Sequence, residues 1–187
     1  MEERGVGLEP RGLASGPHLV TETTPELEQN PTIARIRAWR PEATAGVSAF
    51  RNELTVAVRP EHLRPLAEFL AADADLAFTM LEDITCVDRY PVEPRFELNY
   101  QLLSIKRRES LRLRTRVAGP SPVIASVVPV WPTANWHERE NFDLFGIHFE
   151  GHPDLRRMLL PEDWEGYPLR KDYPTEGPRG TTPGADT

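Results

Sequence analysis

Hydrophobic and polar residues alternate along several stretches of the chain with the period of a β-strand. The stretches ATAGVSAF (residues 43–50) and ELTVAV (residues 53–58) alternate in this way, and a tight turn between them predicts an antiparallel pair. Two further alternating runs, RFELNYQLLSI and SLRLRTRVA, are separated by the polar KRRES and predict a hairpin. These strands predict an antiparallel or mixed β-sheet.

Three other stretches have the spacing of helices. PTIARIRAWR predicts a short helix, and a second helix begins near Pro60, because proline is favoured in a first turn. A third helix lies between Trp131-Pro132 and Gly146, a residue suited to a left-handed helix end. A sheet covered by helices, α+β in class, is the predicted architecture. The apolar side of the second helix consists of Leu63, Leu66, Ala67 and Leu70.

Composition divides the chain into four parts. Residues 1–30 are rich in Gly, Pro, Thr and Glu without periodicity and predict a flexible N-terminal arm, and residues 31–150 hold the α+β core. Residues 151–175 contain several prolines that interrupt any long element, so this segment is expected to run extended over a surface. Residues 176–187 predict a disordered tail.

The third helix has charged residues on both of its sides. Glu138 falls within the same apolar stripe as Phe145, so its carboxylate is expected to be buried or nearly so. It then requires an arginine or several amide donors, unless the helix frays and Glu138 reaches solvent. Arg139 and Asp143 fall on the opposite side and predict an exposed i,i+4 pair. An acid/base couple of Glu138 and Glu140 is disfavoured, because the helix points the two side chains in different directions.

The composition also argues against several classes of function. A net charge of −7 does not suit a nucleic-acid-binding protein, because phosphate binding requires a cationic face. The longest apolar run, Val123 to Trp131, is too short to span a bilayer. The acidic N-terminus lacks the apolar core of a secretory signal, so the cytosolic side is the expected compartment. A single cysteine, Cys86, cannot by itself ligate an iron–sulfur cluster, and it is expected to be a buried structural thiol.

One metal site has to be considered. His148, Glu150 and His152 would face the same way on an extended strand, so these three ligand types could converge on an ion. Gly151 and Pro153 argue against a regular strand there, and the spacing differs from the helical H-E-x-x-H arrangement. A metal site therefore stays the less favoured of two interpretations, the other being histidines bonded to backbone.

Arginines and aromatics gather near the C-terminus without forming a known catalytic motif. Nowhere does the chain contain GxSxG, a P-loop, or GxGxxG followed by a helix. Arginine and aromatic residues are both enriched at protein interfaces, so the combination favours a docking surface over a solvated basic patch. The residues concerned are Arg156, Arg157, Arg170, Lys171 and Asp172, with Trp164, Tyr167 and Tyr173.

These same stretches resemble a known family. LEDITCVDRYP, RFELNYQLLS, ANWHERENFDLFGI and FEGHPDLRRMLLPEDWEGYPLRKDYP occur in the order and spacing typical of the thirty-kilodalton-type (C-type) subunit of NADH-quinone oxidoreductase, or respiratory complex I. The resemblance covers roughly residues 53–173. The ends of the chain lie outside it.

The resemblance implies a cofactor-free structural and assembly subunit in the peripheral arm of a proton-translocating complex, with no independent activity. It implies that the C-terminal segment wraps a partner, the quinone-site (D-type) subunit, and that a cluster-bearing subunit lies nearby. FMN, iron–sulfur clusters and quinone would belong to other subunits of this hetero-oligomer, which would lie on the cytoplasmic side of the bacterial cell membrane. One alternative is the equivalent subunit of a related membrane-bound hydrogenase or deazaflavin-dependent quinone reductase. The alternative of another class is a stand-alone metal-dependent hydrolase using His148, Glu150 and His152.

The resemblance also implies which residues bind partners or support the fold. The family's signature positions carry over to residues of the third helix and of the stretch that follows it. With the three charged residues at 170–172, the predicted set is Glu138, Arg139, Glu140, Asp143, Phe145, Gly146, Gly151, His152, Pro153, Arg156, Arg157, Arg170, Lys171 and Asp172.

Overall fold

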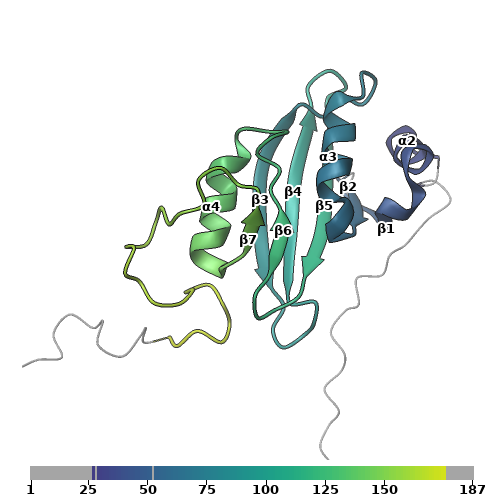
Figure 1. The fold of residues 1–187 in the computed structure, drawn as a ribbon. Coiled ribbons are helices and arrows are strands. Elements are labelled where there is room, and N and C mark those ends of the chain that lie inside the picture. The colour runs from purple at the N-terminus through teal and green to yellow at the C-terminus, as the bar shows by residue number, and fades with distance from the viewer. Residues whose placement is uncertain (1–26, 28, 52, 176–187) are drawn as a thin grey trace, which may run out of the picture.

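A five-stranded sheet with helices on one side forms the centre of the fold (Figure 1). The computed structural model describes residues 27, 29–51 and 53–175, so most of the predicted N-terminal arm and the predicted tail at 176–187 lie outside the described residues. The α+β class and the helices and strands predicted from periodicity are confirmed. In the described part of the chain, no helix is both long and apolar enough to cross a membrane.

The strands of this sheet are β1 (Thr44–Phe50), β2 (Glu53–Val58), β3 (Met80–Asp88), β4 (Phe96–Ser104) and β5 (Glu109–Val117). They lie in the order β1-β2-β5-β4-β3. Three of the four neighbouring pairs are antiparallel, and β2 runs parallel to β5, so the sheet is mixed.

Strand β3 has no clear signal in the sequence, because a register shift between Leu81 and Asp83 interrupts its alternation. Leu81 is buried on one side of this irregularity and Ile84 on the other, a spacing that does not fit the period of a regular strand.

The sheet has one apolar and one polar face. Along β4, Phe96, Leu98, Tyr100 and Leu102 are buried, and Asn99 and Gln101 between them point to the opposite face. Strand β5 repeats the pattern. Burying each of the larger apolar side chains stabilises the fold by about 1.5–3 kcal/mol, which fixes the register of the strands.

Helix α3 (Leu63–Ala72), preceded by the short η2 (Pro60–His62), lies on the apolar face and buries all four of its predicted core residues. Helix α2 (Pro31–Trp39) begins at Asn30, whose side chain accepts hydrogen bonds from two backbone amides of the first turn. It leads through η1 (Pro41–Ala43) into β1. Trp39 of α2 stacks on Phe69 of α3 with ring centroids 4.8 Å apart.

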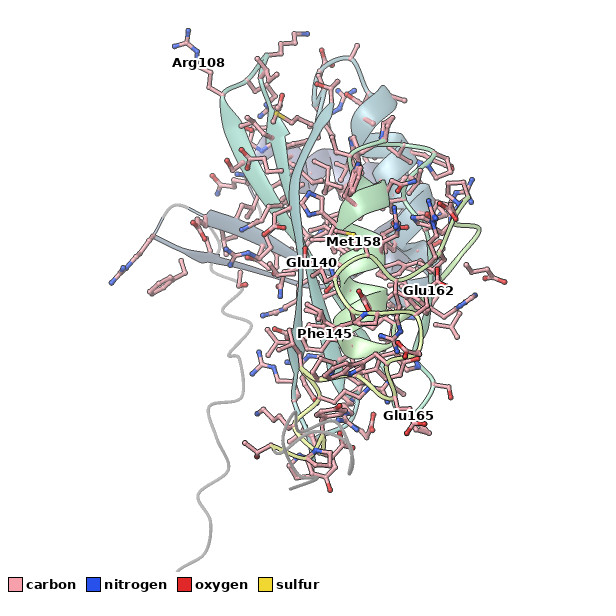
Figure 2. The ribbon with its side chains drawn as sticks, turned by 90° about the vertical axis from the view of Figure 1, so that its left-hand side faces the viewer. Arg108, Glu140, Phe145, Met158, Glu162 and Glu165 are labelled. Atoms are coloured by element: carbon pink, nitrogen blue, oxygen red, sulfur yellow. The ribbon has the colours of Figure 1, made fainter. Side chains whose placement is uncertain are left out.

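Helix α4 (Ala134–Phe145) covers the other half of the apolar face, beside β3. Before and after it come β6 (Val123–Ala125) and β7 (His148–Glu150), two short strands that pair in parallel. Residues 151–175 form neither helix nor strand and run back over α4 (Figure 1). In Figure 2 the helices and this segment lie on one side of the large sheet, and its polar face lies on the other.

Candidate functional site

Helix α4 is fixed at both of its ends. Just before its start, the indole nitrogen of Trp131 donates a 3.0 Å hydrogen bond to the carbonyl oxygen of Phe78. At its end, Gly146 adopts a φ of 71°, as predicted for a left-handed terminating residue. A Cβ at this position would also collide with the ring of Tyr167. The position therefore requires glycine both for its conformation and for the close approach of the C-terminal segment.

Glu138 lies on the sheet side of α4 and is fully buried, as predicted. Its carboxylate accepts hydrogen bonds from the Ser126 hydroxyl at 2.6 Å and from the Val127 amide at 2.7 Å. Among the described residues no arginine pairs with this carboxylate, and the helix does not fray to expose it to solvent. Burial raises its pKa to about 7, since one amide and one hydroxyl only partly offset the loss of water.

Asp143 corrects the prediction of an exposed pair with Arg139. The carboxylate is fully buried, and it pairs with Arg157 at 2.7 Å. Its second oxygen accepts hydrogen bonds from the backbone amides of residues 158–160 at 3.0, 2.7 and 3.0 Å. Burial favours the neutral acid, but these amides and Arg157 outweigh it and hold the pKa of Asp143 below its ordinary value. The helix has two buried sides because the C-terminal segment covers the second.

Arg157 completes this attachment from the side of the segment. One terminal nitrogen donates to both the carboxylate and the backbone carbonyl of Asp143, and the other donates to the carbonyls of Trp164 and Gly166 at 3.1 Å. The guanidinium also lies over the Tyr167 ring. Residues 157–167 therefore fold around a single side chain. In Figure 2 this stretch runs from Met158 past Glu162 to Glu165.

Arg139 binds the same segment through its backbone. Its guanidinium donates to the carbonyl oxygens of Arg156 and Arg157 at 3.2 and 3.3 Å, and it lies over the ring of Trp136. Arg156 itself forms an exposed pair with Asp154. Glu140, Trp136 and Arg156 remain on the outer surface.

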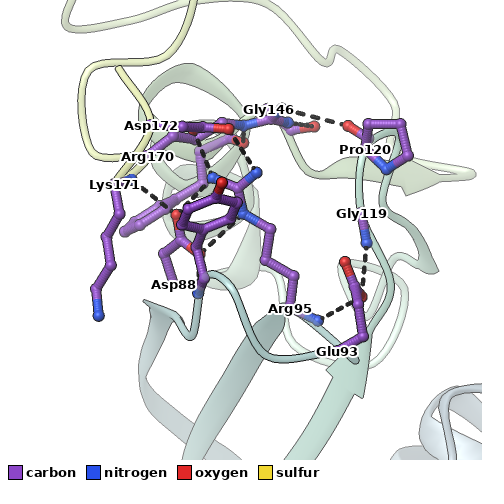
Figure 3. Close-up of polar contacts among 11 residues, drawn as sticks. Asp88, Glu93, Arg95, Gly119, Pro120, Gly146, Arg170, Lys171 and Asp172 are labelled. Atoms are coloured by element: carbon purple, nitrogen blue, oxygen red, sulfur yellow. Dashed lines mark hydrogen bonds and ion pairs between the residues drawn. The ribbon is translucent and has the colours of Figure 1, made fainter. Parts of the chain in front are cut away.

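A second attachment joins the end of the segment to the sheet (Figure 3). Arg95, which is nearly buried, donates to both carboxylate oxygens of Asp88 and to both of Asp172, at 2.6–2.9 Å. The amide of Lys171 donates to Asp88 at 2.8 Å. Although burial opposes it, hydrogen bonding to Arg95 and to backbone amides lowers the pKa of Asp88 to about 2.

Arg170 forms the third attachment, at the C-terminal end of α4 (Figure 3). It donates to the carbonyl oxygens of Phe145, Pro120 and Gly146 at 2.6, 3.2 and 3.4 Å. Carbonyls at the end of a helix lack intrahelical partners, so Arg170 acts as a side-chain cap. Its guanidinium also lies over the ring of Tyr167.

The three residues considered as possible metal ligands, His148, Glu150 and His152, do not form a metal site. His148 and Glu150, the neighbours of the buried Phe149 in β7, are both exposed to solvent. Both ring nitrogens of His152 are engaged with backbone, Nε2 with the Asn135 carbonyl at 3.2 Å and Nδ1 with the Asp154 amide at 3.0 Å. The part of the chain that the structure describes contains no group of three His, Cys, Asp or Glu side chains that could hold a metal ion.

The remaining predicted residues have structural positions. Gly151 takes a φ of 81°, which only glycine adopts without strain, and Pro153 is exposed beside it. Cys86 lies half-buried on β3, and burial raises the pKa of its thiol. A raised pKa disfavours the reactive thiolate and supports a structural role, although the side chain is half-buried and not buried as predicted.

Sequence reasoning missed three residues that hold the site together: Ser126, Asp88 and Arg95. Asp88 and Arg95 stand at the facing ends of β3 and β4, an opposite-charge pair separated by a short proline-bearing loop. The short separation of these two opposite charges can be read from the sequence, and it is the signal that could have identified the pair. Ser126 had no signal, because its position opposite Glu138 depends on the path of residues 126–133.

Fold and site together define a small α+β domain whose irregular C-terminal segment is fastened to its last helix by buried charges. The family described as "Respiratory-chain NADH dehydrogenase, 30 Kd subunit" matches residues 56–179. The chain belongs to this family, whose members are subunits of larger respiratory complexes.

Individual relatives agree with this assignment. The NADH-quinone oxidoreductase subunit of this type from Roseiflexus castenholzii is 50% identical over 146 residues, which are 78% of this chain and 84% of the relative. The protein of the same name from Geotalea uraniireducens is 42% identical over 151 residues, 81% of this chain and 91% of the relative.

Solved structures show the same fold. A trypsin-resistant fragment of Nqo5 is 30% identical, covering 66% of this chain and 96% of the fragment with a TM-score of 0.55. A chain of the membrane-bound sulfane sulfur reductase, an archaeal respiratory membrane complex, is 26% identical, covering 77% of this chain and 84% of that chain with a TM-score of 0.67.

Replacing Asp143 is expected to detach the segment. Asp143→Ala leaves three backbone amides without their acceptor and Arg157 without its carboxylate partner, and loss of one partner of a buried pair costs about 3–5 kcal/mol. Urea unfolding of the full chain measures this, and trypsin should cleave after Arg156 and Arg157 faster than in the wild type. Glu140→Ala, on the outer surface of the same helix, should change stability by less than about 0.5 kcal/mol. Equal effects of the two substitutions would refute the assignment.

Glu138 should make stability depend on pH near neutrality. In the unfolded chain it titrates at its ordinary pKa of 4.5, and in the folded chain at about 7, so the folded state binds its proton more tightly. The contribution of Glu138 to stability is therefore fully present below pH 4.5. It is lost as the pH rises to 7, which lowers the free energy of unfolding by up to about 3 kcal/mol. Glu138→Gln lacks this titration. Denaturant unfolding of both proteins between pH 4.5 and 8 should show that the stability of the variant rises relative to that of the wild type as the pH increases. Parallel curves of stability against pH would contradict the prediction.

Proposed function

We propose that the chain is a structural and assembly subunit in the peripheral arm of an NADH-quinone oxidoreductase, and that the outer surface of α4 and residues 151–175 docks on the quinone-site subunit. The observation that carries this proposal is the set of three attachments, centred on Asp143, Arg95 and Arg170, that give a segment without regular structure one fixed path.

Holding this segment in one path costs conformational entropy, so we infer that its fixed shape serves a function. Ordering each residue of an irregular segment costs about 1–2 kcal/mol of backbone entropy, and 151–175 has few buried apolar side chains to offset it. The segment nevertheless receives three arginine-centred attachments. A pre-ordered surface loses less entropy when a partner binds, which favours docking as its purpose.

The outer surface has the composition of an interface. Trp136 of α4 is 63% exposed and Leu159 of the segment is 55% exposed, with the charges of Glu140 and Arg156 on the same surface. A large exposed tryptophan next to arginines is typical of the residues that dominate binding energy. Arg139 holds Trp136 in place by lying over its ring.

The proposed subunit binds no cofactor. Cys86 is the single cysteine of the chain, and its thiol has a raised pKa, so it suits neither cluster ligation nor nucleophilic chemistry. FMN, iron–sulfur clusters and quinone would lie in other subunits, one cluster-bearing subunit being a neighbour. The complex would hold this chain peripherally on the cytoplasmic side of the bacterial cell membrane.

A second assignment, to a related electron-transferring complex, has one observation in its favour. The chain of the sulfane sulfur reductase complex has the same fold at 26% identity. Relatives named as subunits of NADH-quinone oxidoreductase reach 50% identity, and this difference favours the NADH-linked complex. The stand-alone hydrolase has no support, because His152 is engaged with backbone.

Trp136→Ala tests the docking surface. The side chain is exposed, so the isolated chain should keep its stability, while the amount of assembled complex in membranes should fall severalfold for loss of an anchor worth about 2 kcal/mol or more. Native gels with mass spectrometry measure assembly, and quinone reduction per assembled complex should be unchanged. Ile105→Ala, at an equally exposed apolar residue (64%) in the β4–β5 turn, is the matched control. Full assembly with lost turnover would point instead to a role in the reaction.

A further inference from the structure

The polar face of the large sheet, opposite the helices, carries a cluster of arginines. Because Leu111, Leu113 and Val117 of β5 point into the core, the alternate residues of that strand point to the polar face. Arg89, just after β3, lines a shallow groove of about 290 Å³ together with Arg112 and Arg114, and Arg116 is the next outward residue of β5. The arginine cluster consists of Arg89, Arg112, Arg114 and Arg116.

Two carboxylates, those of Glu97 and Glu53, neutralise only part of the positive charge of this cluster. Glu97 is buried and accepts from Arg89 and Arg116, both at 2.7 Å. Arg112 pairs with Glu53 at 2.7 Å on the edge of the face. Among the described residues, the guanidinium of Arg114 is left without a carboxylate. The net charge of the whole chain is −7, so this local positive excess is not a general property of its surface.

Arg114 is in an unfavourable environment in the isolated chain. It is half-buried and donates to no acceptor in the described part of the chain. Burial lowers its pKa, and three neighbouring guanidiniums add to this effect despite the attraction of Glu97. A half-exposed guanidinium that stands among like charges without a carboxylate is a position where a ligand or partner can supply the opposite charge.

The surroundings of the groove favour a protein as that partner. Thr55, Thr85, Asn99 and Gln101 complete its lining with hydroxyl and amide groups. On the same face of the sheet, Val87 is 41% exposed on β3 opposite Glu97, and Phe50 is 71% exposed at the end of β1. Apolar and aromatic residues beside arginines are typical of protein interfaces.

We propose that this face is a second docking surface, which receives an acidic segment of a neighbouring protein subunit and places one of its carboxylates against Arg114. A guanidinium offers a carboxylate two parallel hydrogen bonds, and flanking arginines strengthen the attraction. Nucleic acid is a poorer fit, because the positive charge does not continue along the face. Toward the β4–β5 turn, three glutamates outnumber two arginines around a second hollow (Glu53, Glu82 and Glu109 against Arg108 and Arg112). This surface lies across the sheet from the one proposed for the quinone-site subunit, so it requires a different region of a partner.

A photo-crosslinking amino acid at Val87 tests the proposal in membranes of the native host. This position is exposed, uncharged and beside the groove, so the substitution leaves the arginine cluster intact. We expect an adduct with another protein subunit, and mass spectrometry should find Asp or Glu residues in the linked peptide. An adduct only with lipid, nucleic acid or this chain itself, or no adduct, would overturn the proposal.

Arg114→Gln in the same background separates docking from folding. Removal of an unpartnered charge among like charges should leave the melting temperature of the isolated chain unchanged or higher, while the adduct yield falls about tenfold, equivalent to ~1.4 kcal/mol. Arg108→Gln makes the same charge change at the distant β4–β5 turn (Figure 2) and should keep the wild-type yield. An unchanged yield in Arg114→Gln would refute the docking role of Arg114, and a lowered melting temperature would show that Arg114 is merely structural.

Discussion

A charge can be buried in a folded protein only where enough partners replace the water it loses, and the burial of Asp143 imposes this constraint on residues 157–167. Its carboxylate takes the Arg157 side chain and three consecutive amides. Those donors lie on a segment with neither helix nor strand, so no ladder of backbone bonds would otherwise hold it. The path of residues 157–167 therefore follows from the hydrogen bonds that one aspartate, Asp143, and one arginine, Arg157, require.

Two carboxylates on α4 illustrate how the environment decides the chemistry of identical groups. Asp143 has more donors than its burial requires, so its pKa falls, whereas Glu138 has one amide and one hydroxyl, so its pKa rises to about 7. Asp143 is therefore a fixed charge that fastens the segment. Glu138 is a group inside the core that titrates near neutral pH, and it joins α4 to the chain that precedes it.

Local periodicity was sufficient for most of the fold and insufficient for the site. Alternation predicted β4 and β5, and helical spacing predicted α3, because one buried face determined each pattern. The same reasoning placed Asp143 in solvent, since a helical wheel assumes one buried side. The donors that cover the other side come from 14 to 17 residues further along an aperiodic stretch. Glu138 was predicted correctly as buried, but its donors at 126–127 carry no pattern that points to it.

The two proposed surfaces differ in how their charges are arranged, and this difference separates their roles. On the α4 side the buried charges of Asp143 and Asp88 already have their partners within the chain, so a docking protein meets a finished shape and gains chiefly from apolar contact with Trp136 and Leu159. Across the sheet, Arg114 lacks an acceptor among the described residues, so its partner must contribute a charge. If the second proposal holds, binding there adds to the stability of the domain as well as to that of the complex, because a carboxylate placed against Arg114 offsets the repulsion among the neighbouring guanidiniums.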